Sequence, residues 1–292
     1  MLPNRGAVLG IDVGYSERRP TTCLCLLEWA DDLVQLSFKK VGTDPTSRTN
    51  ALCGLFPNPE RLAAVAIDGP LTRGLRLVTH YRIADALFSR GVFQKRGKPG
   101  QTSSPVGQRL HDHATRLAEL LVECAARDIF SIAPAVHIEP IHETALVESF
   151  PNQFLGSLID ESNLPVLNRD ASDRYWEYLA TSGGLEILLR TLLEPCRFEV
   201  QPAAIKDHDE RAAVTCALTA LAVAAESAVG VGDAEDGDIF LPPTAIWGTS
   251  CSESSPWIEA ALRKNVNALR RSALRASGSW SGRVRLHDMF WF

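Results

Sequence analysis

The chain has 292 residues, which is long enough to bury a hydrophobic core and fits one large domain or two small ones. Hydrophobic residues make up 45% and charged residues 22%, ordinary globular values that exclude a fibrous or wholly disordered protein. The 30 basic and 35 acidic side chains give a net charge of -5, which argues against a uniformly basic nucleic-acid-binding surface but permits a local basic patch.

The cysteines and the first residues bear on the cellular compartment. Seven cysteines are scattered along the chain without any Cys-x-x-Cys pair, and we interpret them as reduced core thiols. The apolar run near the start is short and is interrupted by Asp12, so it predicts neither a signal peptide nor a membrane span. These features favour a cytoplasmic protein without membrane association.

Three β-strands are predicted at the start of the chain. The apolar run 7–11 is typical of a buried strand, and Asp12 follows it directly. The β-rich runs 21–29 and 33–41 are separated by Ala-Asp-Asp, which has the length and chemistry of a hairpin loop. We therefore expect an antiparallel meander of three strands.

Two later strands also end at acidic residues. The apolar run 61–68 ends in Asp68 before Gly-Pro, and the run 144–150 carries Glu148 just inside its end. Strands of a shared sheet can bring their ends together, which favours an acidic site built from Asp12 and these residues. The alternative is that each acid caps only its own turn.

A basic segment and a series of helices occupy the rest of the chain. Residues 73–107 predict a surface loop between short helices, which either contacts an anionic substrate or is merely solvated. Apolar spacing predicts helices at 109–127, 172–179 and 184–193.

A further helix is predicted from residue 207 onward, with a face of small residues that allows close approach to a sheet. Asp207 has the position of an N-cap, with Glu210 three residues later. Asp209 lies in the first turn, where the helix dipole favours any acid.

The last segment, 246–292, is predicted as an extension to a domain formed by residues 1–245. It combines basic residues with tryptophans, namely Arg263, Lys264, Arg270, Arg271, Arg275, Arg283 and Arg285 with Trp257, Trp280 and Trp291. Such a segment either binds a nucleic-acid backbone and stacks a base, or forms an amphipathic helix that packs through its Ala, Leu and Trp residues.

The order of these elements and acids resembles the ribonuclease H-like fold, an α/β fold in which helices flank a mixed sheet. More closely, the chain resembles the domain-of-unknown-function 429 family, described as predicted ribonuclease H-like nucleases and related in fold to Holliday-junction resolvases. The matching segments are, in chain order, 10–12 (Gly-Ile-Asp), 67–71 (Ile-Asp-Gly-Pro-Leu), 82–85 (Arg-Ile-Ala-Asp), 147–151 (Val-Glu-Ser-Phe-Pro), 171–173 (Ala-Ser-Asp), 207–213 (Asp-His-Asp-Glu-Arg-Ala-Ala) and 232–239.

The resemblance implies a nuclease that hydrolyses phosphodiester bonds with two Mg²⁺ or Mn²⁺ ions, which activate water and stabilise the leaving group. Its catalytic acids would be Asp12, Asp68, Glu148 and Asp209, and the same four with Asp207 would be the metal ligands. Carboxylate oxygens suit these ions. The partner would be nucleic acid, and resolvase-like members often form homodimers. Residues expected to bind the substrate are Ser16, Arg82, Lys95, Arg96 and Lys98.

Two other classes of protein stay open. Residues 12–16 resemble the first phosphate loop of the actin-like ATPases and kinases, which share the core fold. A non-catalytic binding or scaffold protein, in which the acids are only caps, would show no dependence on divalent ions. The histidines His111, His113, His137 and His142 have no spacing typical of a zinc site.

Overall fold

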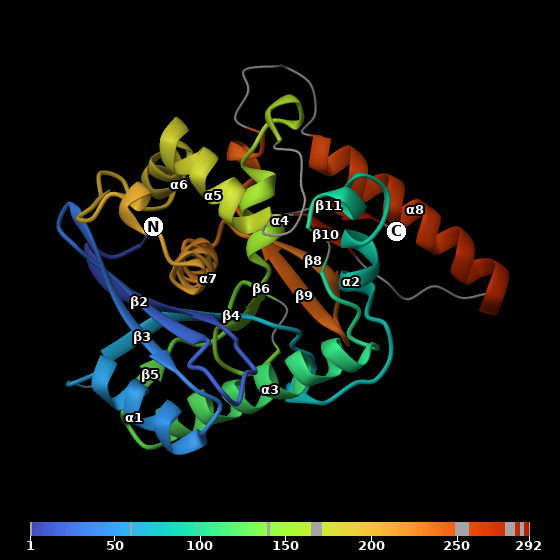
Figure 1. The fold of residues 1–292 in the computed structure, drawn as a ribbon. Helices are drawn as coiled ribbons and strands as arrows, with labels where there is room; N and C mark the ends of the chain where they lie inside the picture. Colours follow the sequence, from blue (N-terminus) through green and yellow to red (C-terminus); the bar gives the residue numbers. More distant parts are fainter. Residues whose placement is uncertain are drawn as a thin grey trace.

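The structure is a computed structural model. It describes residues 2–58, 60–97, 99–138, 141–164, 171–248, 257–277, 284–286 and 289–291. Figure 1 shows a central sheet with helices on both faces. This mixed α/β layout confirms the fold class expected from the sequence.

The sheet has nine strands. Their bounds are β1 Arg5–Asp12, β2 Thr22–Ala30, β3 Leu33–Val41, β4 Glu60–Asp68, β5 Phe130–Ile132, β6 Leu146–Ser149, β7 Arg197–Phe198, β8 Val229–Asp233 and β9 Gly237–Leu241. The order across the sheet is β7-β3-β2-β1-β4-β6-β9-β8, and β5 also pairs with β4.

The sheet is antiparallel on one side and mainly parallel on the other. The strands β1, β2 and β3 form the predicted antiparallel meander. Next to them β1, β4, β6 and β9 run parallel, so their carboxyl ends meet at one edge. The acids at the ends of these strands lie at this edge, which is where open α/β sheets bind their ligands.

The helices are α1 Pro45–Leu55, α2 Ile83–Phe88, α3 Pro105–Ala126, α4 Pro151–Ser157, α5 Ala171–Ser182, α6 Gly184–Leu192, α7 His208–Ala224 and α8 Trp257–Ser277. Short 3-10 turns cover Arg73–Leu75, Gly91–Lys95, Glu161–Asn163, Pro202–Ala204 and Thr244–Ile246. A separate two-stranded sheet is formed by β10 Val284–Leu286 and β11 Met289–Trp291. In Figure 1, α7 crosses one face of the central sheet, while α1 and α3 cover the other.

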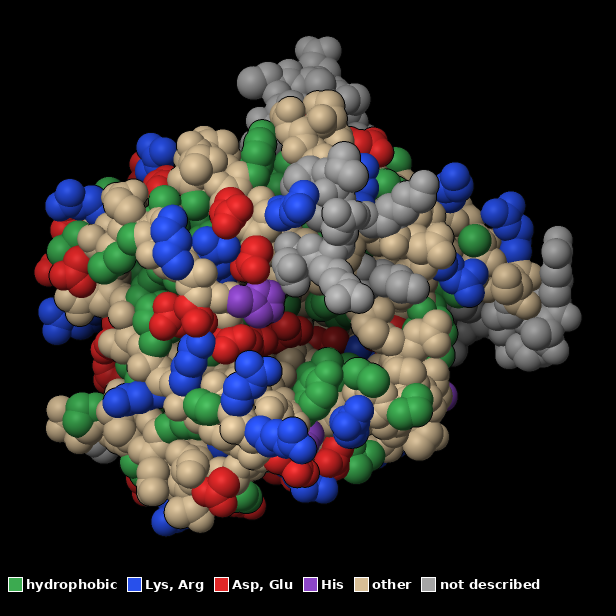
Figure 2. All heavy atoms as spheres, in the orientation of Figure 1, with side chains coloured by type: hydrophobic (Ala, Val, Ile, Leu, Met, Phe, Trp, Pro, Cys, Tyr) green, Lys and Arg blue, Asp and Glu red, His purple; other side chains and the backbone are tan. Residues whose placement is uncertain are grey.

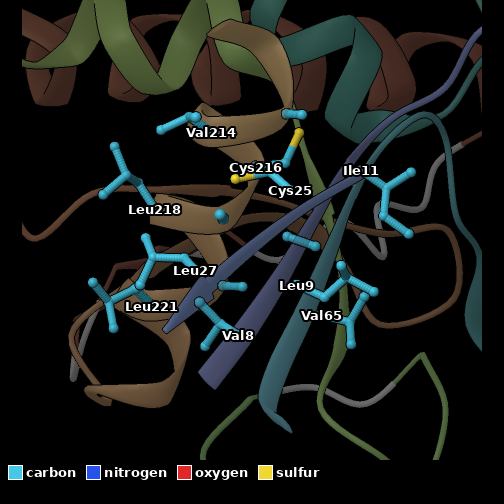
Figure 3. Packing of buried hydrophobic residues seen from close by; sticks show 14 of the residues in the cluster. Val8, Leu9, Ile11, Cys25, Leu27, Val65, Val214, Cys216, Leu218 and Leu221 are labelled. Carbon is cyan, nitrogen blue, oxygen red and sulfur yellow. The ribbon is translucent and has the colours of Figure 1, made fainter. Parts of the chain in front are cut away.

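The approach of α7 to β1 depends on a glycine. A Cβ atom on Gly10 would lie 2.1 Å from the backbone nitrogen of Ala217 and 2.2 Å from the carbonyl oxygen of Ala213. Only a residue without a side chain fits there, because real Cβ atoms do not come so close to backbone atoms. Figure 3 shows the apolar contact that continues along this face, where Leu27 of β2 lies near Leu221 of α7. The close contact brings the first turn of α7 beside the end of β1.

The last described helix belongs to a second hydrophobic core. Ile258, Leu262, Val266 and Leu269 of α8 are buried there together with residues of α2, β8 and β9. The side chain of Asn265 adds a hydrogen bond of 2.7 Å to the carbonyl oxygen of Leu87 at α2. The helix α8 is therefore amphipathic and packs through one face. Trp280 and Arg283 of the predicted basic extension lie outside the described residues.

Two further features of the described residues are the state of their cysteines and the character of their helices. Six cysteines are described, all as free thiols, and five of these six are buried. None of the described helices combines the length and the apolar character that crossing a membrane requires.

Candidate functional site

Two aspartates occupy the ends of adjacent parallel strands. Asp12 of β1 is in register with Asp68 of β4, so the two side chains lie next to each other on the same face of the sheet. Both line a cavity of about 270 Å³. Figure 2 shows a hollow in the middle of the displayed face that is lined by acidic side chains.

The electrostatics of this pair are unfavourable in the absence of a cation. Burial, followed by the charges of Asp68 and Asp209, raises the pKa of Asp12 well above its usual range. Burial and the charge of Glu148 raise the pKa of Asp68 to about 7, against a small opposing effect of His208. Both shifts show that the folded protein disfavours negative charge on these two carboxyl groups.

The cavity is also lined by the first turn of α7, through His208 and Ala212. The Nδ1 atom of His208 lies 3.0 Å from a carboxylate oxygen of Asp173, which fixes the ring against α5. His208 was not predicted as a site residue from the sequence. The available signal was its position between two predicted metal ligands, Asp207 and Asp209, at the start of a helix.

The two acids that flank His208 are bound by a lysine. Asp207 is the N-cap of α7 and accepts a hydrogen bond of 3.1 Å from the backbone N–H of Glu210, as predicted. Lys40 Nζ donates to Asp207 at 2.6 Å and to Asp209 at 2.9 Å. Burial lowers the pKa of Lys40, but the hydrogen bonds to Asp207 and Asp209 and the charges of these acids outweigh burial and raise the pKa above its usual value. The ammonium group therefore stays charged and partly neutralises the acidic site.

Glu148 differs from Asp12 and Asp68 in the face of the sheet on which its side chain starts. In the sheet it is in register with Ile67 rather than with Asp68, so its side chain starts on the opposite face. Ser149 occupies the row of the aspartates, and its Oγ is 2.8 Å from the hydroxyl of Thr219 on α7. The side chain of Glu148 therefore starts on the face away from the two aspartates, although its charge still acts on Asp68, and we leave this residue out of the ligand set.

Glu148 is engaged by a buried arginine. Arg82, expected to bind the substrate, has 0% of its surface exposed. Its guanidinium donates to both carboxylate oxygens of Glu148, at 2.7 and 2.8 Å, and to Asp85 at 2.8 Å. Burial raises the pKa of Glu148, although Arg82 opposes this effect. The backbone N–H of Leu71 also donates to Glu148 at 2.9 Å, so this network fixes the loop that follows Asp68.

The other residues expected to bind the substrate are in different situations. Ser16 is partly exposed in the loop after β1, where its Oγ accepts a hydrogen bond from the backbone N–H of Arg18. Arg96 stacks on Trp257 at 4.8 Å and donates to Glu161 at 3.4 Å. Lys98 lies outside the described residues, and the side chain of Lys95 is not described. These residues do not form one basic surface in the part of the chain that the structure describes.

The fit of a metal ion is determined by Asp12 and Asp68. Among the described residues no group of three or more His, Cys, Asp or Glu side chains has the geometry to hold an ion. Mg²⁺, however, is usually bound by one or two carboxylates and completes its shell with water and substrate oxygens. Two adjacent carboxylates with raised pKa values that face a cavity fit this mode. The described residues do not by themselves provide a complete ligand shell for a metal ion.

Comparisons with known proteins give no further assignment. No protein-family model, no curated protein and no solved structure matches the chain. The interpretation of the site therefore depends on its own geometry.

Proposed function

We propose that this protein is a metal-dependent nuclease of the ribonuclease H-like type, which binds Mg²⁺ or Mn²⁺ and hydrolyses phosphodiester bonds. One observation carries the proposal: the parallel register of β1 and β4 aligns Asp12 with Asp68 beside a cavity. The sequence resemblance to the domain-of-unknown-function 429 family supports the same activity. The partner would be nucleic acid, and the resemblance extends the proposal to a homodimer. The scattered cysteines without a Cys-x-x-Cys pair extend it to a cytoplasmic location.

The residues of the chain would divide the work as follows. Asp12 and Asp68 would hold the cation, because they are the two carboxylates that share the cavity. A bound cation would lower the raised pKa values of both, so the site would be fully ionised when it is loaded. The metal would supply Lewis acidity at the phosphoryl oxygens and an activated water.

Residues beside the pair would orient the substrate. His208 lines the same cavity and is held by Asp173, which makes it a donor to a phosphate oxygen. Asn152 and Ser172 line the cavity as well and are polar groups without charge. This division of roles places cation binding on the sheet and substrate contacts on the helices around it.

The test combines metal binding with cleavage. Mn²⁺ is titrated calorimetrically into the wild type, Asp12→Asn and Asp68→Asn, and single-stranded, duplex, hybrid and junction substrates are incubated with each protein. We expect binding by the wild type, at least about tenfold weaker binding by both variants, and cleavage only by the wild type.

The matched control is Asp128→Asn. Asp128 is exposed, lies after α3 and has a positive φ of 57°, a conformation that Asn tolerates well. This variant should bind Mn²⁺ and cleave like the wild type. Metal binding and cleavage that persist in Asp12→Asn and Asp68→Asn, or an inactive wild type that binds no Mn²⁺, would overturn the proposal.

A non-catalytic binding protein is the second candidate, and a specific observation favours it. Three of the five predicted metal ligands are engaged within the protein, Glu148 by Arg82 and both α7 acids by Lys40. This candidate predicts no effect of Mn²⁺ in the same titration.

For an ATPase, the amide of Gly14 would have to contact phosphate, but it donates to Thr22 Oγ1 at 3.2 Å.

A further inference from the structure

A cluster of aromatic and basic side chains joins the loop after β1 to helix α3. Tyr15 is 38% exposed, although tyrosine rings usually cover part of the core. Its ring is stacked on His113 of α3 with a centroid distance of 6.5 Å and an interplanar angle of 30°. The guanidinium of Arg109, one helical turn earlier on α3, lies 5.7 Å from the centre of the same ring. We call these three residues the Tyr15 cluster.

The position of Tyr15 is fixed from the side of β1. Tyr15 follows Asp12 by three residues, so the two lie within about 10 Å of each other along the chain. Between them, the carbonyl oxygen of Gly14 accepts from Thr22 Oγ1 at 3.0 Å and from Arg48 at 3.3 Å. These hydrogen bonds anchor the loop at a buried arginine and hold the exposed ring at the end of the strand.

The packing of α3 on the end of β4 independently relates the Tyr15 cluster to this edge of the sheet. Gly69, which directly follows Asp68, packs against α3, where a Cβ atom on it would lie 2.7 Å from Cβ of Ala114. Ala114 is the neighbour of His113 in α3. The Tyr15 cluster therefore lies near the carboxyl ends of β1 and β4 on the α3 side of the sheet, whereas the side chains of Asp12 and Asp68 start on the α7 side.

The chemistry of the cluster is that of a stacking platform with a cationic edge. Burial and the charge of Arg48 lower the pKa of His113, so its ring stacks as neutral imidazole near neutral pH. Arg109, Arg18 and Arg19 are exposed, and none of the three forms an ion pair with the residues that the structure describes. Figure 2 shows basic side chains below the acidic hollow.

Acidic residues also lie near the cluster and limit its positive charge. Glu17 and Asp112 both act on the pKa of His113. Asp112, however, is paired with Arg116 at 3.0 Å, so it does not neutralise Arg109. The exposed aromatic ring and the surrounding arginines thus remain available to a ligand that is both anionic and planar.

From this arrangement we infer that the Tyr15 cluster is a subsite for an unpaired nucleotide, in which a base stacks on Tyr15 and Arg109 contacts the backbone phosphate. Single-strand binding proteins combine the same two interactions, an aromatic face for bases and a basic groove for phosphates. The inference rests on the proposed function in taking nucleic acid as the substrate. It adds that the strand is single or locally unpaired where it passes Asp12.

The test measures binding without cleavage. The anisotropy of a fluorescein-labelled single-stranded oligonucleotide is followed in EDTA with the wild type, Tyr15→Ala and Tyr15→Phe. Tyr15→Ala should weaken binding by about 5- to 150-fold, the usual effect of losing one stacked base. Tyr15→Phe should bind within about twofold of the wild type, because it keeps the aromatic face.

Controls separate stacking from charge and from folding. Val136→Ala removes another exposed apolar side chain, on the segment between β5 and β6, and should leave binding unchanged. With an abasic strand of equal length, the difference between the wild type and Tyr15→Ala should vanish. Arg109→Gln should weaken binding to both strands and reduce the dependence of affinity on salt, whereas Arg61→Gln should not.

The outcomes distinguish this inference from the proposed function. Binding that depends on Tyr15 in a protein that cleaves nothing supports the subsite and counts against the nuclease. Cleavage with an affinity that is insensitive to Tyr15→Ala overturns the subsite alone. A wild type that binds no oligonucleotide, or a Tyr15 effect that persists with the abasic strand, also overturns it.

Discussion

Two groups of carboxylates differ in how their charge is balanced: Asp12 and Asp68 end the strands β1 and β4, whereas Glu148 of β6 is joined by Asp85 of helix α2. Glu148 and Asp85 share the guanidinium of Arg82, whose hydrogen bonds to them include contacts of 2.7 and 2.8 Å. Asp12 and Asp68, by contrast, form no ion pair with the described residues and face a cavity. The register of the sheet separates Glu148 from the two aspartates, because its side chain starts on the opposite face.

The difference shows which acids the fold uses for its own stability. A buried ion pair that satisfies all its hydrogen bonds contributes to a defined structure, and removing one partner leaves an uncompensated charge. Acids that are crowded together without a cation raise each other's pKa, which destabilises the folded state unless a ligand binds. The Arg82 network therefore belongs to the structure of the loop after Asp68, and the Asp12–Asp68 pair is the candidate for function.

The largest expected effect is the loss of Arg82. Arg82→Met should lower the free energy of unfolding by about 3–5 kcal/mol, because Glu148 and Asp85 would be left buried without their cation. Urea unfolding followed by circular dichroism measures this change. In Arg82→Met/Glu148→Gln, part of the loss should be recovered, since one of the two buried charges is removed as well.

The control for this prediction is Arg61→Met. Arg61 is exposed at the start of β4, and its replacement should change the free energy of unfolding by less than about 0.5 kcal/mol. A loss below about 1 kcal/mol for Arg82→Met would mean that the network is not the main support of the loop, and the contrast between the two carboxylate groups would fail.

The pH dependence of stability tests the other group. The pKa of Asp68 is raised from 3.8 to about 7 in the folded protein. Between these values the folded state binds more protons than the unfolded state, so stability falls as the pH rises from about 4 to 7. Asp68→Asn removes this loss, and near pH 8 it should exceed the wild type in free energy of unfolding by on the order of 2 kcal/mol.

This difference between Asp68→Asn and the wild type should become small near pH 4, where Asp68 is protonated in the folded state and about half protonated in the unfolded state. Asp128→Asn should show no such pH-dependent difference. Urea titrations at a series of pH values, in the absence of divalent ions, provide the measurement. A difference that is constant over this range, or a less stable Asp68→Asn at pH 8, would contradict the raised pKa.

Much of the fold follows from patterns that are local in the sequence. The apolar runs before Asp12 and Asp68 predicted their strands, and the three-residue loop at 30–32 predicted the hairpin of the meander. The small residues of α7 predicted close packing on a sheet, and Ala213 and Ala217 indeed meet Gly10. These features need only periodicity and the size of side chains, which are readable without a three-dimensional structure.

The acidic site was predicted less completely because its composition depends on register. Glu148 and Ser149 are adjacent in the sequence, and a shift of one residue decides which of them faces α7. Likewise, nothing near Arg82 in the sequence indicates that it reaches Glu148, 66 residues away. Pairings between distant segments determine these contacts, and single-sequence patterns do not contain them.

Lys40 gives the smallest expected effect and the sharpest test of charge balance at the open site. Among the described residues, its ammonium group is the only cation that forms ion pairs with Asp207 and Asp209, and its side chain is 30% exposed. Lys40→Gln should therefore cost no more than about 1 kcal/mol of stability. The same change should strengthen Mn²⁺ binding about 3- to 10-fold, because it removes a positive charge that acts on Asp12.

Lys39→Gln is the matched control for this prediction, since adjacent residues of β3 point to opposite faces of the sheet. It removes the same charge from the chain but should leave the affinity for Mn²⁺ unchanged. Calorimetric titration of both variants at equal ionic strength compares them directly. Equal affinities in the two variants would show that Lys40 neutralises only Asp207 and Asp209, and that the Asp12–Asp68 pair is electrostatically independent of them.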